Sequence, residues 1–344
     1  MGVRNGRNFS NKVSISRLRS GVCGLSGHFC HLLPTMDMTI RPYIYAFHMP
    51  FFFLVSGILH KYDGTIQIKK YARTLLIPFL FFNAVFFVLK PICYWLGIWS
   101  NSRFEAFDEF FPMLWDFTRF EFIEVITGKN GINGPTWFIA ALFWCKVFMD
   151  LLKKHKWLMV GFFALFLALF VIKNPMKGQN ALFVRQACMT FPFYFVGCIG
   201  KEFFHRMSLA KVGWKVLLFV VAIAASCVMT HLNGRVSTVA GNFGNLPYKI
   251  CIPVFYFNAT VASIGILFLS SCFKENKWVK TTALALITIL GVQNLFIYTL
   301  HSHVQNMFLL CAVLSILILI CCVLIHQLLE KHCPVLVGKV KAKK

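Results

Sequence analysis

The chain has 344 residues, of which 58% are hydrophobic and only 14% charged, and its formal net charge is +23. Soluble domains are about 45–50% apolar and about 25% charged, so this composition excludes an ordinary soluble domain. Continuous apolar runs of around 20 residues predict an all-α, polytopic membrane helix bundle, and they exclude a transmembrane β-barrel, whose strands alternate apolar and polar residues.

The N-terminal segment 1–36 contains basic residues and no acid, which is typical of a cytoplasmic segment. Nine clear spans follow it, and nine spans with a cytoplasmic C-terminus would leave the N-terminus outside. We therefore expect a tenth, degenerate helix within residues 15–34. The Cys and His residues of 23–31 match no common zinc spacing, so no metal site is expected.

Nine candidate spans follow in chain order: 42–60, 74–96, 135–153, 157–173, 188–204, 214–231, 249–271, 280–300 and 304–327. Basic residues follow alternate spans, whereas segment 97–134 holds half of the acidic residues. This positive-inside pattern places the basic loops and the basic tail 331–344 in the cytoplasm. Membrane topology thus accounts for the charge, and no nucleic-acid partner is expected.

The first clear span, 42–60, carries His48 two positions before Pro50. Its length gives about 28 Å of helix, just enough to cross the hydrocarbon. Pro50 is expected to bend the helix and free a backbone carbonyl, while Ser56 and Gly57 permit close approach of another helix. An ionisable group inside a membrane indicates function, so His48 is a candidate functional residue. The alternative is a histidine that only bonds to a neighbouring helix.

The basic segment before the second span carries Lys70 and Arg73, three residues apart. Residues at this spacing share one face of a helix and could bind the phosphates of an anionic cosubstrate. The alternative is that they only mark topology.

Polar residues at the outer ends of the later spans predict a wet, histidine-lined pocket that opens outward. Trp137 is expected at the outer interface, where an aromatic anchor is the alternative. A loop rich in Gly and Asn offers Asn233 and Arg235, although a plain turn favours the same residues. Tyr298 and His301 lie on one helical stripe, which must face the bundle interior or water.

Several sequence blocks follow one another in an order that resembles the membrane acyltransferase-3 family: YIYAFHMPFFFLVSGIL, KKYARTLLIPFLFFN, GPTWFIAALF, FPFYFVGCIGKEF and LFIYTLH. The branch that they resemble contains fucose O-acetylases and exopolysaccharide O-acetyltransferases. The resemblance covers residues 27–330, which we interpret as an integral membrane acyltransferase domain. It implies a ten-helix bundle that transfers acetyl from acetyl-CoA to a hydroxyl of a cell-surface or lipid-linked glycan.

The resemblance also implies a basic residue and an apolar helix before a Gly-His pair, which here is Gly27-His28. His28 is therefore the alternative to His48, or its partner, as general base. The apolar helix is missing, so we interpret residues 1–26 as an atypical segment that arises from a shifted reading frame or a mis-called start.

The predicted function is thus a membrane O-acyltransferase, multi-pass in a bacterial cell membrane and surrounded by its lipids. A histidine would take the proton of the sugar hydroxyl, because its pKa lies near neutrality. Lys70 and Arg73 would bind acetyl-CoA, and the residues of the outer pocket would bind the glycan. The alternative is a polysaccharide or lipid-glycan transporter, which also needs a polar path, although the sequence shows no internal repeat.

Overall fold

The computed structural model describes residues 41–99, 101, 103–104, 107–127, 132–155, 158, 161, 181–237, 242–273, 276–301 and 308–339. Within these ranges every regular element is a helix, and one isolated bridge joins Ser237 to Asn242. His28, the segment 1–26 and all but two residues of the predicted span 157–173 lie outside the described residues.

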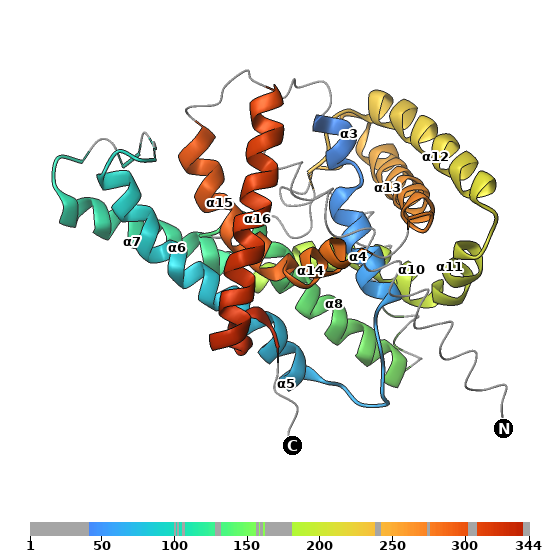
Figure 1. Ribbon diagram of the computed structural model, residues 1–344, viewed down its shortest axis with the longest axis horizontal. Helices are drawn as coiled ribbons and strands as arrows, with labels where there is room; N and C mark the ends of the chain where they lie inside the picture. The colour runs from blue at the N-terminus through green and yellow to red at the C-terminus, as the bar shows by residue number, and fades with distance from the viewer. Residues whose placement is uncertain are drawn as a thin grey trace. The chain divides into compact units, whose positions relative to one another are not determined.

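Figure 1 shows the helices coloured along the chain. In order they are α3 (Arg41–Tyr45), α4 (His48–Ile58), α5 (Ile68–Tyr71), the π-helix η1 (Ala72–Leu76), α6 (Ile77–Trp95), α7 (Phe110–Thr127), the 3₁₀ turn η2 (Gly134–Thr136), α8 (Trp137–Lys154), the 3₁₀ turn η3 (Ala181–Phe183), α10 (Val184–Ile199), α11 (Lys201–Ser208), α12 (Val212–Asn233), α13 (Tyr248–Ser270), α14 (Lys277–Leu284), α15 (Leu286–His301), α16 (Phe308–His332) and the 3₁₀ turn η4 (Pro334–Val337).

Five described segments are long and apolar enough to cross a membrane: Ile68–Trp95, Gly134–Lys154, Val212–Asn233, Lys249–Ser270 and Val313–His332. A sixth is added if α14 and the following Leu286–Thr299 form one broken span. The predicted all-α class is confirmed, whereas the count of nine spans is not. The predicted first span forms only the shorter apolar segment Pro42–Ile58, and the predicted span 188–204 is divided between α10 and α11.

The chain divides into two compact units. Unit 1 consists of Met1–Thr65, Met149–Lys173 and Cys188–Leu286, and unit 2 consists of Ile66–Phe148, Asn174–Ala187 and Ile287–Lys344.

In unit 1, α4 and α10 cross with their backbones in contact. A Cβ atom on Gly57 would lie 2.0 Å from the carbonyl oxygen of Tyr194, and a Cβ atom on Gly197 would lie 2.0 Å from the carbonyl oxygen of Leu54. Both distances are far below van der Waals contact, so this crossing requires glycine on both helices. The predicted close approach of another helix at Gly57 is therefore confirmed.

The helices α12 and α13 form the most extensive helix pair among the described elements of unit 1. Ala222 of α12 faces Gly265 of α13, where an added Cβ would lie 2.7 Å from the Ala222 Cβ. In the most apolar 18-residue stretch of α12 only 11% is buried, whereas 50% of the corresponding stretch of α13 is buried. Most of α12 therefore presents apolar side chains outward, as a helix in lipid does.

In unit 2, aromatic side chains pack between α6, α7 and the segment that connects them. Phe104 and Phe117 are buried, with their ring centroids 5.5 Å apart, and Trp99 stacks on Phe86 at 6.2 Å. Such pairs add to the free energy of burial.

Candidate active site

The chain breaks its first apolar helix directly before His48. Helix α3 ends at Tyr45, Ala46 and Phe47 form a turn, and α4 begins at His48. The sequence predicts one helix bent at Pro50; the structure corrects this, because the helix stops and restarts with Pro50 in the first turn of α4. Proline fits there, since the first N–H groups of a helix have no helical acceptor.

The break fixes the orientation of the His48 ring. His48 is only 3% exposed, and its Nδ1 lies 3.2 Å from the carbonyl oxygen of Ile44 in α3. The Tyr45 ring packs on the imidazole with a centroid distance of 4.9 Å. Because a carbonyl oxygen can only accept, Nδ1 carries the proton in this bond, and the basic lone pair of the neutral ring is on Nε2.

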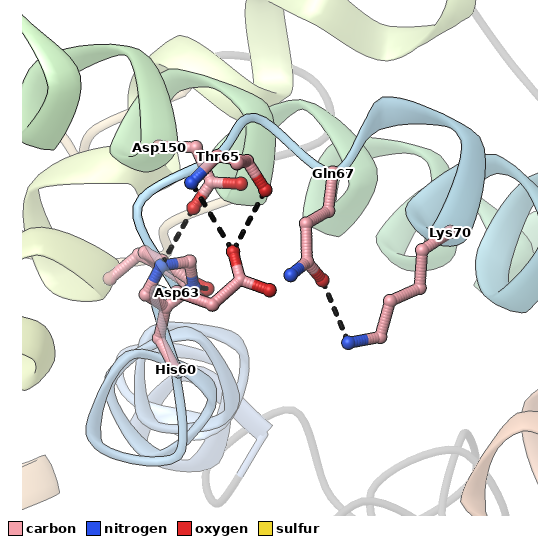
Figure 2. A network of polar contacts seen from close by, with 7 residues as sticks. His60, Asp63, Thr65, Gln67, Lys70 and Asp150 are labelled. Atoms are coloured by element: carbon pink, nitrogen blue, oxygen red, sulfur yellow. Dashed lines mark hydrogen bonds and ion pairs between the residues drawn. The ribbon is translucent and has the colours of Figure 1, made fainter.

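A second histidine, His60, lies in a buried polar cluster just beyond the C-terminal end of α4 (Figure 2). Its Nε2 is 3.1 Å from Oδ1 of Asp150 on α8, and its Nδ1 is 2.7 Å from the hydroxyl of Tyr194 on α10. A ring that donates from Nε2 to the carboxylate can accept the Tyr194 hydroxyl proton at Nδ1. None of the three residues is more than 4% exposed, so the cluster lies in the interior of unit 1, where it joins α8 and α10 to the segment after α4.

Sequence reasoning overlooked this cluster, although one signal was present. Asp150 is an acid inside the predicted apolar span 135–153, and an intramembrane carboxylate indicates a polar partner. The sequence predicts its partner His60 only as the last residue of the span 42–60. The glycine crossing at Gly57 brings that end beside Tyr194, and this contact is not visible in local sequence.

Asn233 and Arg235 lie in unit 1, at the end of α12 and in the loop that follows it. Asn233 is 1% exposed, and its side-chain amide donates to the Phe243 carbonyl over 2.7 Å. The backbone carbonyl of Asn233 accepts the Asn245 N–H over 2.6 Å. A Cβ on Gly244 would lie 2.2 Å from the Asn233 side-chain oxygen. Asn233 therefore holds the loop together, while Arg235 is exposed on it.

In unit 2, Trp137 follows a buried network of side-chain amides. Asn83 donates to the Thr136 hydroxyl over 3.0 Å and accepts the Asn133 N–H over 3.1 Å. Asn133 accepts from Asn294 over 3.3 Å and donates to a carbonyl of α15 over 2.6 Å. Trp137 itself is 5% exposed, so its ring belongs to the interior of the unit.

Tyr298, by contrast, is 43% exposed on α15. Its ring packs on Trp99 with a centroid distance of 5.3 Å, and the Trp99 indole N–H donates to Thr299 over 3.1 Å. The exposed Tyr298 ring is thus supported from behind by a fixed indole. Helix α15 ends at His301, whose side chain lies outside the described residues.

Lys70 and Arg73 are both exposed in unit 2. Lys70 donates to the side-chain oxygen of Gln67 over 2.7 Å (Figure 2). Arg73 lies in the π-helix η1 and makes no ion pair or side-chain hydrogen bond with any residue that the structure describes. Two features mark this point of the chain. The Ile77 N–H donates to the Ala72 carbonyl, five residues back, and Pro78 has no N–H to donate to the Thr74 carbonyl.

The predicted site residues are therefore divided between the units. His48, Asn233 and Arg235 lie in unit 1, whereas Lys70, Arg73, Trp137, Tyr298 and the backbone of His301 lie in unit 2. Within unit 2, the amide network joins η2 to α15, which carries Tyr298.

Comparison with known proteins gives one match. A family model described as an acyltransferase domain, Acyl_transf_3, matches residues 18–327. No curated protein and no solved structure matches the chain.

Proposed function

This chain belongs to the acyltransferase-3 family, and from that membership we propose that it is an O-acyltransferase of the cell membrane. The proposed reaction moves acetyl from acetyl-CoA to a hydroxyl of a cell-surface or lipid-linked glycan, as in the fucose and exopolysaccharide O-acetylases that the sequence resembles. The observation that supports the chemistry is the buried His48 ring, whose Nδ1 lies 3.2 Å from the carbonyl oxygen of Ile44.

In the proposed step, Nε2 of His48 takes the proton of the glycan hydroxyl as the oxygen attacks the thioester carbonyl. The new C–O bond forms, the C–S bond breaks, and CoA leaves as a thiol with the proton that the ring returns. The ring becomes cationic when it takes the proton, and its Nδ1–H bond to the Ile44 carbonyl then strengthens as a charge-assisted bond. His28 remains the proposed partner or alternative base.

The proposed donor contacts are Lys70 and Arg73. The positive-inside pattern assigns both residues to the cytoplasmic side, and it assigns the C-terminus to the same side. Acceptor binding is proposed for the outer residues. Of these, Arg235 and Tyr298 present exposed side chains, whereas Asn233 and Trp137 are buried and would act by holding the loop and the start of α8 in place. His301 completes the proposed set.

The test of the base is His48→Gln in the full chain, compared with His332→Gln at the exposed C-terminal end of α16. Glutamine keeps hydrogen-bonding capacity but cannot accept a proton with similar basicity, so acetyl transfer should fall about 10²-fold or more at normal membrane levels. The control should transfer at the wild-type rate.

A well-expressed His48→Gln protein with wild-type transfer would assign the base elsewhere. Wild-type membranes that move the glycan across the bilayer without acetylating it would instead support the transporter.

The donor contacts are tested separately. Replacing Lys70 and Arg73 with Gln removes charge-assisted contacts that are worth about 1.5–3 kcal/mol each. The KM for acetyl-CoA should rise strongly, while the KM for the glycan stays unchanged. If the double variant is inserted in the membrane and its KM for acetyl-CoA is unchanged, Lys70 and Arg73 do not bind the donor and only mark the topology of the chain.

A further inference from the structure

The last described residues of the chain, Pro334–Lys339, form a closed turn that we name the C-terminal hook. The Lys339 N–H donates to the Pro334 carbonyl over 2.9 Å, and the Gly338 N–H donates to the Val335 carbonyl over 3.1 Å. Gly338 has a φ of +78°. This pair of bonds around a left-handed glycine is the Schellman arrangement, which ends helical segments in a defined geometry.

Two kinds of contact hold the C-terminal hook in unit 2. Val337 is 4% exposed, so the turn is anchored by an apolar side chain. The Lys339 ammonium forms an ion pair with Glu330 of α16. Glu330 also lies 3.3 Å from Nε2 of His326, whose Nδ1 is 2.9 Å from the hydroxyl of Thr288 on α15.

The hook packs on the π-helix η1. A Cβ atom on Gly338 would lie 2.4 Å from the carbonyl oxygen of Thr74, so the backbones of the two segments are in contact. This is the carbonyl that has lost its α-helical donor, because Pro78 has no N–H. The chain therefore places a glycine, the only residue that fits, against the irregular point of η1.

The same π-helix carries the exposed Arg73, and Lys70 precedes it by one turn. A π-helical turn is a rare conformation that needs support from its surroundings, and such turns occur frequently at functional sites. A backbone held in one conformation keeps two cations in a fixed spacing, so that they bind phosphate with a smaller loss of conformational entropy. The side chains are exposed, so support must come from the backbone below them.

We infer that the C-terminal hook is a positioning element of the donor site, which holds η1 so that Arg73 and Lys70 meet the phosphates of acetyl-CoA. This inference rests on the proposed function. Gly338 and Val337 are then positioning residues, which act through η1 without contact with the donor. If the hook only sealed the end of α16, its loss would lower stability and leave donor affinity unchanged.

The test is equilibrium binding of acetyl-CoA to the full chain in lipid nanodiscs. Gly338→Ala adds one methyl group against the Thr74 carbonyl and should raise the Kd for acetyl-CoA at least tenfold. Gly97→Ala is the matched control, because Gly97 also has a positive φ, +66°, but an added Cβ would have nothing within 4 Å. Val337→Ala, which adds no atom and removes the apolar anchor, should weaken binding in the same direction. Hydrogen exchange of Ala72–Leu76 should accelerate in both hook variants and remain slow in the control.

The outcomes separate the two proposals. Folded hook variants that bind acetyl-CoA with wild-type affinity would overturn the positioning role alone. An equal loss of affinity in Gly97→Ala, or a loss accompanied by faster exchange throughout α12 and α13, would also overturn it, because the effect would be global. A wild-type chain that binds no acetyl-CoA would overturn the proposed donor and the positioning role together.

Discussion

Replacing Gly57 with Ala should separate α4 from α10 and break the His60 cluster. The new Cβ would start 2.0 Å from the Tyr194 carbonyl oxygen, whereas real Cβ contacts essentially never fall under 3.0 Å, so the two backbones must move apart by about 1 Å. The same displacement would stretch the 2.7 Å contact between His60 and the Tyr194 hydroxyl beyond hydrogen-bond length.

The expected loss of stability has two parts. Overpacking costs about 1–3 kcal/mol, and a buried polar group that loses its partner costs about 1–3 kcal/mol more. The free energy of unfolding should therefore fall by about 2–6 kcal/mol, measured by reversible denaturation in mixed detergent micelles.

Gly213→Ala is the matched control for this experiment. Gly213 lies in the first turn of α12, in the same unit, and an added Cβ there would meet nothing within 4 Å. This control should be neutral or stabilise by about 0.5–1 kcal/mol, because alanine restricts the unfolded chain more than glycine. A Gly57→Ala protein as stable as the wild type, or an equal loss in Gly213→Ala, would refute the crossing argument.

Two further predictions concern ion pairs of unit 2. Glu121→Gln should lower the free energy of unfolding by about 3–5 kcal/mol, because it leaves the buried Lys90 ammonium without the carboxylate that lies 2.9 Å away. The paired variant Lys90→Met with Glu121→Leu should recover most of this loss. A paired variant as unstable as the single one would contradict the argument. The hydrogen bonds from Arg103 lower the pKa of Asp116 below its usual value. The stability that these hydrogen bonds add is therefore fully present above the usual pKa of an aspartate, and it is lost as the pH falls through the lowered pKa of Asp116. Arg103→Gln should return the pKa of Asp116, measured by carboxyl ¹³C NMR, toward its usual value.

Sequence alone was sufficient where the physical cause is local or compositional. The apolar runs predict the all-α membrane class, and the small residues at Ser56 and Gly57 predict the close helix contact that the structure shows. The family match over residues 18–327 agrees with the resemblance that the sequence blocks indicate.

Other features depend on which distant helices meet, and local sequence does not contain this information. His60 becomes part of a polar cluster only because α10 supplies Tyr194 and α8 supplies Asp150. The sequence predicts Asn233 as a donor for the acceptor glycan in a turn-rich loop, whereas its side-chain amide is buried and donates to the Phe243 carbonyl. In place of the predicted bend at Pro50, the structure has a two-residue turn at Ala46 and Phe47, and the helix restarts at His48 with the proline in its first turn.

The apolar segment that carries His48 is short for the bilayer, because it ends at Ile58 and not at His60. Pro42–Ile58 contains 17 residues, about 26 Å of helix, whereas the hydrocarbon is about 30 Å thick. Such negative hydrophobic mismatch is relieved by local thinning of the membrane or by association with neighbouring helices. Thinning would bring headgroups and water down toward the imidazole, so lipid acyl-chain length would control how readily a polar molecule reaches His48. Under the proposed function, acetyl transfer should be faster in vesicles of short-chain lipids than in vesicles of long-chain lipids.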